Sequence, residues 1–409
     1  MFSIGLAIVM FTAVVLLLVA LLMVARKKMV ASGDVAITVN EDSTKVMKVA
    51  AGGTLLSALT DHKIFIPSAC GGKGTCGVCE VIVKEGGGAI LPTETGFISR
   101  KEAKHGCRLA CQVKVKRDMR IEVPAEIFSV RKWDCKVLSN RNVSTFIKEL
   151  IVELPPGEDV PFRAGGYVQI SCPPHQLAYK DFDIETQFRE EWDKFDLWRF
   201  KSVVTEPVER GYSLASYPLE KGLLMFTIRI VFPPNYDDKI PPGKMSSFLF
   251  NLKSGDHVTV AGPFGEFFAR DTDKEMCFVA AGAGMAPMRS HIYDQLLRLK
   301  STRKMSFWYS ARNLSEVFYV DEFNKLAAEH PNFKWHIVLS EPRPEDNWTG
   351  PVGLVRHKAL HHLFLANHPA PEDVEYYLCG PDVMNKAVIR MCMDVGVDRE
   401  NIMLDDFGL

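Results

Sequence analysis

Three cysteines and four glycines share ten residues of this chain: Cys70-Gly71-Gly72-Lys73-Gly74-Thr75-Cys76-Gly77-Val78-Cys79. A fourth cysteine follows at a distance in Arg108-Leu109-Ala110-Cys111-Gln112. Two sulfide-bridged irons need four thiolates, and the plant-type spacing that supplies them, C-x4-C-x2-C…C, differs here only by one extra residue in the first gap. The glycines permit positive φ, so that backbone N–H groups can point at the sulfurs. The loop therefore predicts a [2Fe-2S] cluster.

Two other interpretations of the loop are weaker. A zinc knuckle usually pairs two C-x2-C units, and an intracellular chain would not keep a disulfide oxidised. The first three ligands are Cys70, Cys76 and Cys79, whereas Cys107 and Cys111 both lie in the region of the fourth. We expect Cys111, because its segment resembles the fourth-ligand segment of ferredoxins with the longer first gap. Cys107 is then a buried or half-buried neighbour.

Composition sets wide bounds. A length of 409 residues predicts two to four domains. A hydrophobic content of 47% and a charged content of 24% are ordinary for globular protein, and a net charge of −1 gives no indication of nucleic-acid binding. Four further cysteines lie singly among apolar residues and are expected in the core: Cys135, Cys172, Cys277 and Cys392.

The N-terminal region contains an uncharged, apolar run from Ile4 to Ala25. About 20 such residues span a bilayer as a helix. A signal peptide would carry its positive charges before a shorter apolar core, but here they follow it, at residues 26–28. These charges place the remaining chain in the cytoplasm. We expect residues 1–28 to form one transmembrane anchor, without ionisable groups for an ion path.

Residues 33–128 resemble a β-grasp ferredoxin over their whole length. The expected elements are strands at Asp34–Val39, Thr44–Val49, around Val113 and at Met119–Val123, with a short helix at Thr54–Leu59 before the cysteine loop.

Residues 129–270 contain short segments in which apolar and polar residues alternate, with frequent proline and glycine between them. This pattern predicts an antiparallel β-barrel. Three motifs follow one another within it: Arg210-Gly211-Tyr212-Ser213, Gly243-Lys244-Met245-Ser246-Ser247 and Gly262-Pro263-Phe264-Gly265. In this order they resemble the FAD domain of the ferredoxin-NADP reductase superfamily.

That resemblance implies roles for the motif residues. Arg210 would pair with the flavin pyrophosphate, and Tyr212 would pack its ring on the isoalloxazine. Ser213 would hydrogen-bond the flavin edge near its redox-active nitrogen. Gly243 and Ser246, at a helix N-terminus, would suit the pyrophosphate.

An acidic and aromatic insertion interrupts the barrel at residues 175–205. Its acidic side chains are interleaved with Trp192, Phe195, Trp198 and Phe200. A docking surface for a partner and a plain surface excursion are equally consistent with this composition.

Residues 271–409 alternate strands with helices, as in a Rossmann-like parallel α/β domain. The expected strands are Met276–Ala281, Met305–Tyr309, Trp335–Leu339 and Glu375–Cys379, and a helix is expected at Met288–Leu299. The turn Gly282-Ala283-Gly284-Met285-Ala286-Pro287 and the segment Cys379-Gly380-Pro381 resemble the two nucleotide-binding markers of the same reductase superfamily. The resemblance places Gly282, Gly284, Pro287, Gly380 and Pro381 on the nucleotide, Cys379 beside the nicotinamide, and the near-terminal Phe407 over the flavin.

NADH is favoured over NADPH. A 2′-phosphate needs cations, and after the strand ending at Tyr309 the sequence offers only Arg312, followed soon by Glu316.

The predicted fold class is a multidomain chain, α/β and all-β: anchor 1–28, [2Fe-2S] domain 33–128, FAD barrel 129–270 and NADH domain 271–409. Over nearly its whole length it resembles the NADH-oxidising subunits of bacterial sodium-translocating NADH:quinone reductases. This implies hydride transfer from NADH to FAD, single electrons passed to the cluster, and delivery to partner membrane subunits that reduce ubiquinone and export Na+ at the bacterial inner membrane. One alternative is a membrane-tethered NADH reductase for a di-iron oxygenase. Another is a non-catalytic scaffold subunit, and the complete ligand and flavin motifs disfavour this second alternative.

Overall fold

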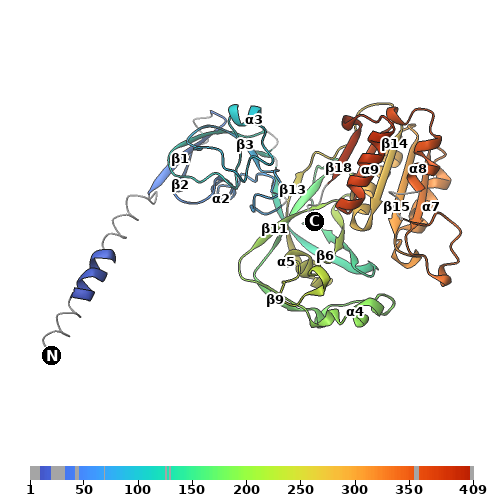
Figure 1. The fold of residues 1–409 in the computed structure, drawn as a ribbon, viewed down its shortest axis with the longest axis horizontal. Coiled ribbons are helices and arrows are strands. Elements are labelled where there is room, and N and C mark those ends of the chain that lie inside the picture. Colours follow the sequence, from blue (N-terminus) through green and yellow to red (C-terminus); the bar gives the residue numbers. More distant parts are fainter. Residues whose placement is uncertain are drawn as a thin grey trace. The chain divides into compact units, whose positions relative to one another are not determined.

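The computed structural model describes residues 10–19, 33–41, 46–68, 70–124, 127–128, 130–353 and 359–405. The chain forms two compact units, Met1–Val130 and Arg131–Leu409. The first unit contains one five-stranded sheet, and the second contains a six-stranded antiparallel sheet and a five-stranded parallel sheet (Figure 1).

The predicted N-terminal span is described only in part. Residues 10–19 are helical, and their side chains are exposed. Across the described ranges, the structure has no helix that is both long and apolar enough to cross a membrane. Residues 4–9 and 20–25 of the predicted span lie outside the described residues.

The first unit is organised around a mixed sheet in the order β2-β1-β5-β3-β4. Its central pair, β1 and β5, is parallel, and the other neighbours are antiparallel. The strands are β1 Asp34–Val39, β2 Val46–Ala50, β3 Glu80–Glu85, β4 Cys107–Leu109 and β5 Met119–Glu122. Helix α2 (Leu55–Asp61) starts at Thr54, whose hydroxyl accepts from the Ser57 amide, and it buries Leu55 and Leu59 in the core of this unit. This is the β-grasp order that the sequence predicts.

The prediction of a strand around Val113 is wrong. Val113 and Val115 are buried, as their alternation with lysines suggests, but within the described residues the strand-type pairing of this segment is limited to an isolated bridge between Lys114 and Thr54. Alternation reports which side chains face the core and says nothing about a backbone partner. A second short helix of the unit, α3 (Arg100–Lys104), starts with a capping box.

The second unit begins with the antiparallel sheet, in the order β11-β8-β13-β6-β7-β12. Its strands are β6 Arg131–Ser144, β7 Ile147–Glu153, β8 Tyr167–Cys172, β11 Val208–Ser213, β12 Leu223–Arg229 and β13 His257–Phe264. Ala215, two residues beyond the end of β11, donates its amide to the carbonyl of Met225 in β12 at 2.7 Å. This bond draws the first and last strands of the order toward each other.

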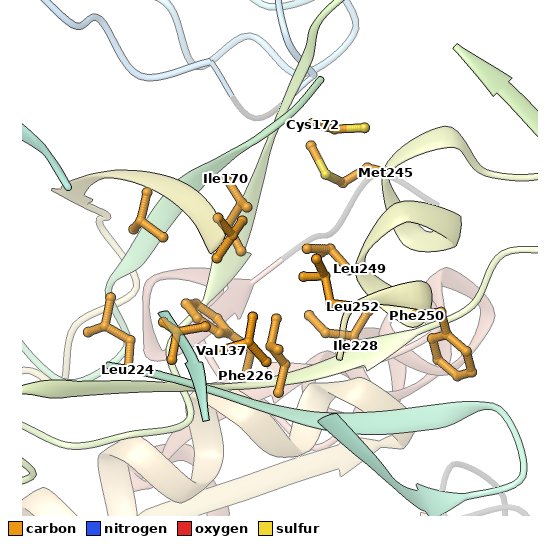
Figure 2. Close-up of a cluster of buried hydrophobic side chains, with 14 of the residues drawn as sticks. Val137, Ile170, Cys172, Leu224, Phe226, Ile228, Met245, Leu249, Phe250 and Leu252 are labelled. Atoms are coloured by element: carbon orange, nitrogen blue, oxygen red, sulfur yellow. The ribbon is translucent and has the colours of Figure 1, made fainter. Parts of the chain in front are cut away.

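Helix α5 (Lys244–Asn251) packs on the core of this sheet. Met245 and Leu249 point from the helix toward side chains of the strands, including Ile170 and Ile228 (Figure 2). Burial of these apolar side chains fixes the helix and therefore the backbone at its N-terminus.

The insertion at 175–205 returns close to where it starts, because β9 (His175–Ala178) pairs antiparallel with β10 (Lys201–Val204). Between them, α4 (Glu190–Lys194) carries Trp192, which is fully buried. Phe200 is also buried and Trp198 is partly buried against the same core, whereas Phe195 is exposed. Most of the insertion's aromatic residues are therefore core residues and not an exposed docking surface.

The parallel sheet has the order β16-β15-β14-β17-β18. Its strands are β14 Met276–Ala281, β15 Met305–Ala311, β16 Phe333–Leu339, β17 Glu375–Cys379 and β18 Ile402–Asp405, and its helices are α6 Met285–Tyr293, α7 Val320–Glu329, α8 Leu360–Leu363 and α9 Asp382–Asp394. The predicted Rossmann-like strand order along the chain is thus confirmed.

The helix after the glycine turn starts earlier than expected. We expected it at Met288, after Pro287, but α6 begins at Met285. Proline is tolerated in the first turn, where its missing N–H has no intrahelical partner. The helix continues as a π-helical segment at Asp294–Arg298.

Candidate functional site: a cysteine loop and a nucleotide groove

The four predicted cluster ligands form two thiol pairs. Cys70 hydrogen-bonds Cys76 inside the loop, and Cys79, just before β3, hydrogen-bonds Cys111, just after β4. Electrostatic interactions also connect Cys76 with Cys79 and Cys70 with Cys111. A [2Fe-2S] centre has two irons that each bind two thiolates, so two neighbouring pairs match its donor set. Within the part of the chain that the structure describes, no three His, Cys, Asp or Glu side chains converge on a single metal-ion position.

One thiol of each pair is acidic. The hydrogen bond from Cys76 lowers the pKa of Cys70 to about 3, and the hydrogen bond from Cys79 lowers the pKa of Cys111 to about 6. The same two bonds, followed by burial, raise the pKa of Cys76 and of Cys79. Thiolates are the form that binds metal, so the loop is prepared to receive positive charge.

Backbone amides surround these sulfurs. Those of Lys73 and Thr75 point at Cys70, and that of Gly74 points at Cys111. The glycines at 71, 72, 74 and 77 all have positive φ, as the loop sequence predicts. At Gly77 a Cβ would also lie 2.7 Å from the Cδ1 atom of Phe97, so a larger residue would distort the loop.

Cys107 lies apart from the two pairs. Its thiol donates to the Glu80 carboxylate at 3.7 Å, and burial followed by the charge of Glu80 raises its pKa to about 11. Gln112, in contrast, donates from Nε2 to the Cys111 sulfur at 3.4 Å. Cys111, and not Cys107, is thus the thiol that pairs with Cys79, which agrees with Cys111 as the fourth ligand.

Three of the predicted flavin residues, Arg210, Tyr212 and Ser213, lie on β11. Arg210 and Tyr212 are half-buried, and the Arg210 Nη1 atom donates to the Glu209 carbonyl at 2.6 Å. Burial raises the pKa of Tyr212 above its usual value, so its hydroxyl stays neutral. Ser213 ends the strand and donates to the Asp405 Oδ2 atom at 2.8 Å, which connects β11 to β18.

Ser246 is held inside the protein. Its hydroxyl donates to the Gly243 carbonyl at 3.1 Å and accepts from the Val231 amide at 3.2 Å. A Cβ at Gly243 would lie 2.6 Å from the Ser246 Oγ atom. These contacts fix the start of α5, and a direct contact of Ser246 with FAD stays a prediction.

The glycine turn and the Cys379 segment meet in one groove. A cavity of about 700 Å3 is lined by residues of both, including Gly284, Gly380 and Pro381, and by β12 and the loop after it. Cys379 is fully buried at the end of β17, and a Cβ at Gly284 would lie 2.0 Å from its carbonyl oxygen. Only glycine therefore allows this close approach. Pro287 is buried in α6, beyond the turn.

A smaller cavity of about 230 Å3 continues the groove toward the end of β15. Both cavities share Phe146, Arg229, Ala281 and Pro381. The smaller one also holds Gly282, whose φ is +57° and whose carbonyl accepts from the Tyr309 hydroxyl at 3.2 Å. Together the two cavities give a long cleft across the carboxyl ends of the strands, where nucleotides bind in such sheets.

Some lining residues were missed from the sequence. Arg229 and Phe146 belong to the antiparallel sheet and its hairpin, yet both line the nucleotide groove. Thr227 donates to the Ala283 carbonyl at 2.9 Å and fixes the glycine turn against β12. No motif marks these positions, because their role depends on contacts with residues more than 50 positions away. Phe407 lies outside the described residues.

Comparisons with known families agree with this layout. Residues 37–116 match the 2Fe-2S iron-sulfur cluster binding domain, 194–268 the oxidoreductase FAD-binding domain, and 278–390 the oxidoreductase NAD-binding domain. The chain is therefore an iron–sulfur flavoprotein oxidoreductase that uses a [2Fe-2S] cluster, FAD and NADH.

The curated relatives narrow this class. The chain is 59% identical over 409 residues to the F subunit of the Na(+)-translocating NADH-quinone reductase of Methylococcus capsulatus, covering 100% of both chains. It is 60% identical over 407 residues to that of Pseudomonas aeruginosa, covering 100% of this chain and 99% of the relative. This chain belongs to the family of F subunits of the Na(+)-translocating NADH-quinone reductases.

The fold is also seen in solved structures. The cytochrome P450 reductase GcoB of Amycolatopsis superposes with a TM-score of 0.62 at 22% identity, over 91% of this chain and 98% of that one. At this identity the likeness concerns the fold alone.

Proposed function

We propose that this chain is the electron-input subunit of a membrane-bound NADH:quinone reductase that exports Na+. When bound, FAD accepts a hydride from NADH and the [2Fe-2S] cluster carries single electrons onward. Partner membrane subunits then reduce ubiquinone. The observation that carries this proposal is the groove in which the Cys379 segment and the glycine turn face β12 of the antiparallel sheet.

Individual residues have distinct roles in the proposal. Cys70, Cys76, Cys79 and Cys111 hold the cluster. Arg210, Tyr212, Ser213, Gly243 and Ser246 bind FAD, and Gly282, Gly284, Pro287, Gly380 and Pro381 bind the nucleotide. Cys379 and Ser213 border the place where hydride passes, and Phe407 covers the flavin until nicotinamide arrives.

The proposed location is the bacterial inner membrane, with one N-terminal span and the cofactor domains in the cytoplasm. The apolar run from Ile4 to Ala25 and the positive residues 26–28 support it. The proposed domains are 1–28, 33–128, 129–270 and 271–409.

Purification with untagged neighbours tests the proposal. The tagged full-length chain should co-purify in detergent with very hydrophobic subunits, and the complex should reduce ubiquinone with NADH and drive Na+ uptake in vesicles. Co-purification of a soluble di-iron protein, without quinone reductase activity, would contradict it and favour an oxygenase reductase.

A further inference from the structure

The insertion at 175–205 reaches the nucleotide groove through one ion pair. Glu191 of α4 accepts from the Arg312 Nη1 atom at 2.6 Å, and the Arg312 Nη2 atom donates to Glu316 at 3.1 Å. The Arg312 side chain is 39% exposed, whereas those of Glu191 and Glu316 are 17% and 10% exposed. Two carboxylates from different parts of the chain thus engage both terminal nitrogens of one guanidinium.

Arg312 lies where the additional 2′-phosphate of NADPH would bind. It follows β15, the strand next to β14 and its glycine turn, and it lines the smaller cavity with Ser310. In nucleotide-binding sheets of this kind, a residue beyond the end of that neighbouring strand faces the ribose 2′ position, where an arginine accommodates the phosphate of NADPH.

The local charge balance is set by Glu191. The charged residues lining the smaller cavity are Arg229, Arg312 and Glu316, with a sum of +1. Glu191 approaches from the insertion and brings this sum to zero. A 2′-phosphate carries nearly two negative charges, so the same carboxylate both removes an attractive charge and occupies a donor that the phosphate would need.

The insertion holds Glu191 firmly in this position. The next residue, Trp192, is fully buried, and its indole N–H donates to the Thr145 carbonyl at 3.0 Å. The Thr145 amide in turn donates to Glu316 at 3.2 Å. Hydrogen bonds through Thr145 therefore connect the helix that carries Glu191 with Glu316, so both carboxylates are held around Arg312.

We propose that Glu191 is a specificity-determining residue of the NADH-oxidising site: by pairing with Arg312, it selects against NADPH from outside the nucleotide domain. The acidic insertion then has a function within the reductase itself.

The direct test measures kcat/KM for NADH and NADPH with the full-length chain. Glu191→Gln should raise the ratio of the NADPH value to the NADH value by about tenfold or more, because Arg312 becomes available to the phosphate. Glu190→Gln is the matched control: Glu190 is adjacent and pairs with Arg343 at 3.5 Å, and this variant should leave the ratio unchanged. The double variant Glu191→Gln/Arg312→Gln should lose the gain. An unchanged ratio in Glu191→Gln, an equal gain in Glu190→Gln, or a gain that persists in the double variant would overturn the inference.

A second measurement needs no variant. Adenosine 2′,5′-bisphosphate and adenosine 5′-monophosphate should be compared as competitors of NADH on the wild-type chain. The bisphosphate should inhibit no better than the monophosphate, and inhibition tenfold stronger would refute the inference. A wild-type chain that oxidises neither dinucleotide would contradict the assigned activity, whereas an altered selectivity result in an NADH-active chain concerns Glu191 alone.

Discussion

Glu94 and Arg108 form a buried, bidentate ion pair beside the cluster loop. The Arg108 Nε atom donates to Glu94 Oε1 at 2.9 Å and its Nη2 atom donates to Oε2 at 2.8 Å, while Glu94 is fully buried. The same carboxylate accepts from the backbone amides of Leu91 and Leu109. Glu94 therefore fixes the turn at residues 91–94 to the segment that carries Cys111.

Breaking this pair should destabilise the first unit. Glu94→Gln leaves a buried guanidinium without its counter-charge, which typically costs about 3–5 kcal/mol in the free energy of unfolding. The exposed pair between Lys84 and Glu122, at 3.1 Å, provides the control: Glu122→Gln should cost about 0–1 kcal/mol. Urea unfolding of both variants measures the difference, and equal midpoints would contradict a structural role for the buried pair.

The ion pair of Glu94 with Arg108 also predicts that the free energy of unfolding decreases at acid pH. Burial acts to raise the pKa of Glu94, but the hydrogen bonds from Arg108 and from the Leu91 and Leu109 amides outweigh it, so the folded pKa is below its usual value. The group then contributes stability above its unfolded pKa of about 4.3, and that contribution is lost as the pH falls through the lower folded value. In Glu94→Gln the unfolding free energy should depend less on pH below about 5.

The cluster ligands can be tested one by one. Serine at Cys70, Cys76, Cys79 or Cys111 should abolish the visible absorption of the cluster and its EPR signal after reduction, while FAD remains bound. Cys107→Ser should change neither, because its thiol is engaged with Glu80. A lost signal in Cys107→Ser together with a retained one in Cys111→Ser would reverse the assignment of the fourth ligand.

Flavin variants should fall into two kinds. Arg210→Leu and Tyr212→Ala should lower the flavin content of the purified protein, Arg210→Leu more strongly, because loss of a charge-assisted contact costs about 1.5–3 kcal/mol. Ser246→Ala should lower flavin content and also the melting temperature of the flavin-free protein, since its hydroxyl connects Gly243 with Val231. Lys201→Leu, at an exposed lysine, is the control. Full flavin occupancy in all three site variants would refute the assignment.

The nucleotide turn gives a steric prediction. In Gly284→Ala the new Cβ would lie 2.0 Å from the Cys379 carbonyl oxygen, so the turn or the end of β17 must move. A displacement of about 1 Å near the reacting groups can lower a rate about a hundredfold. We expect kcat/KM for NADH to fall by that order, with FAD retained, while Gly96→Ala, which meets nothing within 4 Å, has no effect. Normal kcat/KM in Gly284→Ala would show that this approach is not needed.

The sequence predicted elements whose signals are local. The spacing of Cys70, Cys76 and Cys79 predicted a [2Fe-2S] cluster, which the match of residues 37–116 to the 2Fe-2S domain confirms. The apolar strands Met276–Ala281 and Glu375–Cys379 have the expected bounds. A buried parallel strand is an apolar run that ends at a turn, so its limits are visible in one dimension.

Other features depend on distant partners. Residues 113–116 alternate like a strand. Within the described residues, however, they form no strand ladder, and their strand-type pairing is one isolated bridge. Glu191 pairs with Arg312, 121 positions away, and Trp192 is buried against the core of the antiparallel sheet. Composition revealed an acidic and aromatic insertion but could not tell which side chains turn inward.

The last prediction separates the anchor from the redox domains. Removal of residues 1–30 should leave a soluble protein that still oxidises NADH and reduces artificial one-electron acceptors at nearly the rate of the full chain, because the flavin and nucleotide residues lie far beyond this segment in the sequence. Quinone reduction should fail, since the tether supplies the effective concentration that holds the cluster domain near its membrane partners. Membranes that lack the subunit should regain NADH-driven Na+ uptake with the intact chain and little with the truncated one. Full restoration by the truncated chain would show that the anchor is dispensable, and Na+ uptake by the intact chain alone in liposomes would show that the ion path does not require partner subunits.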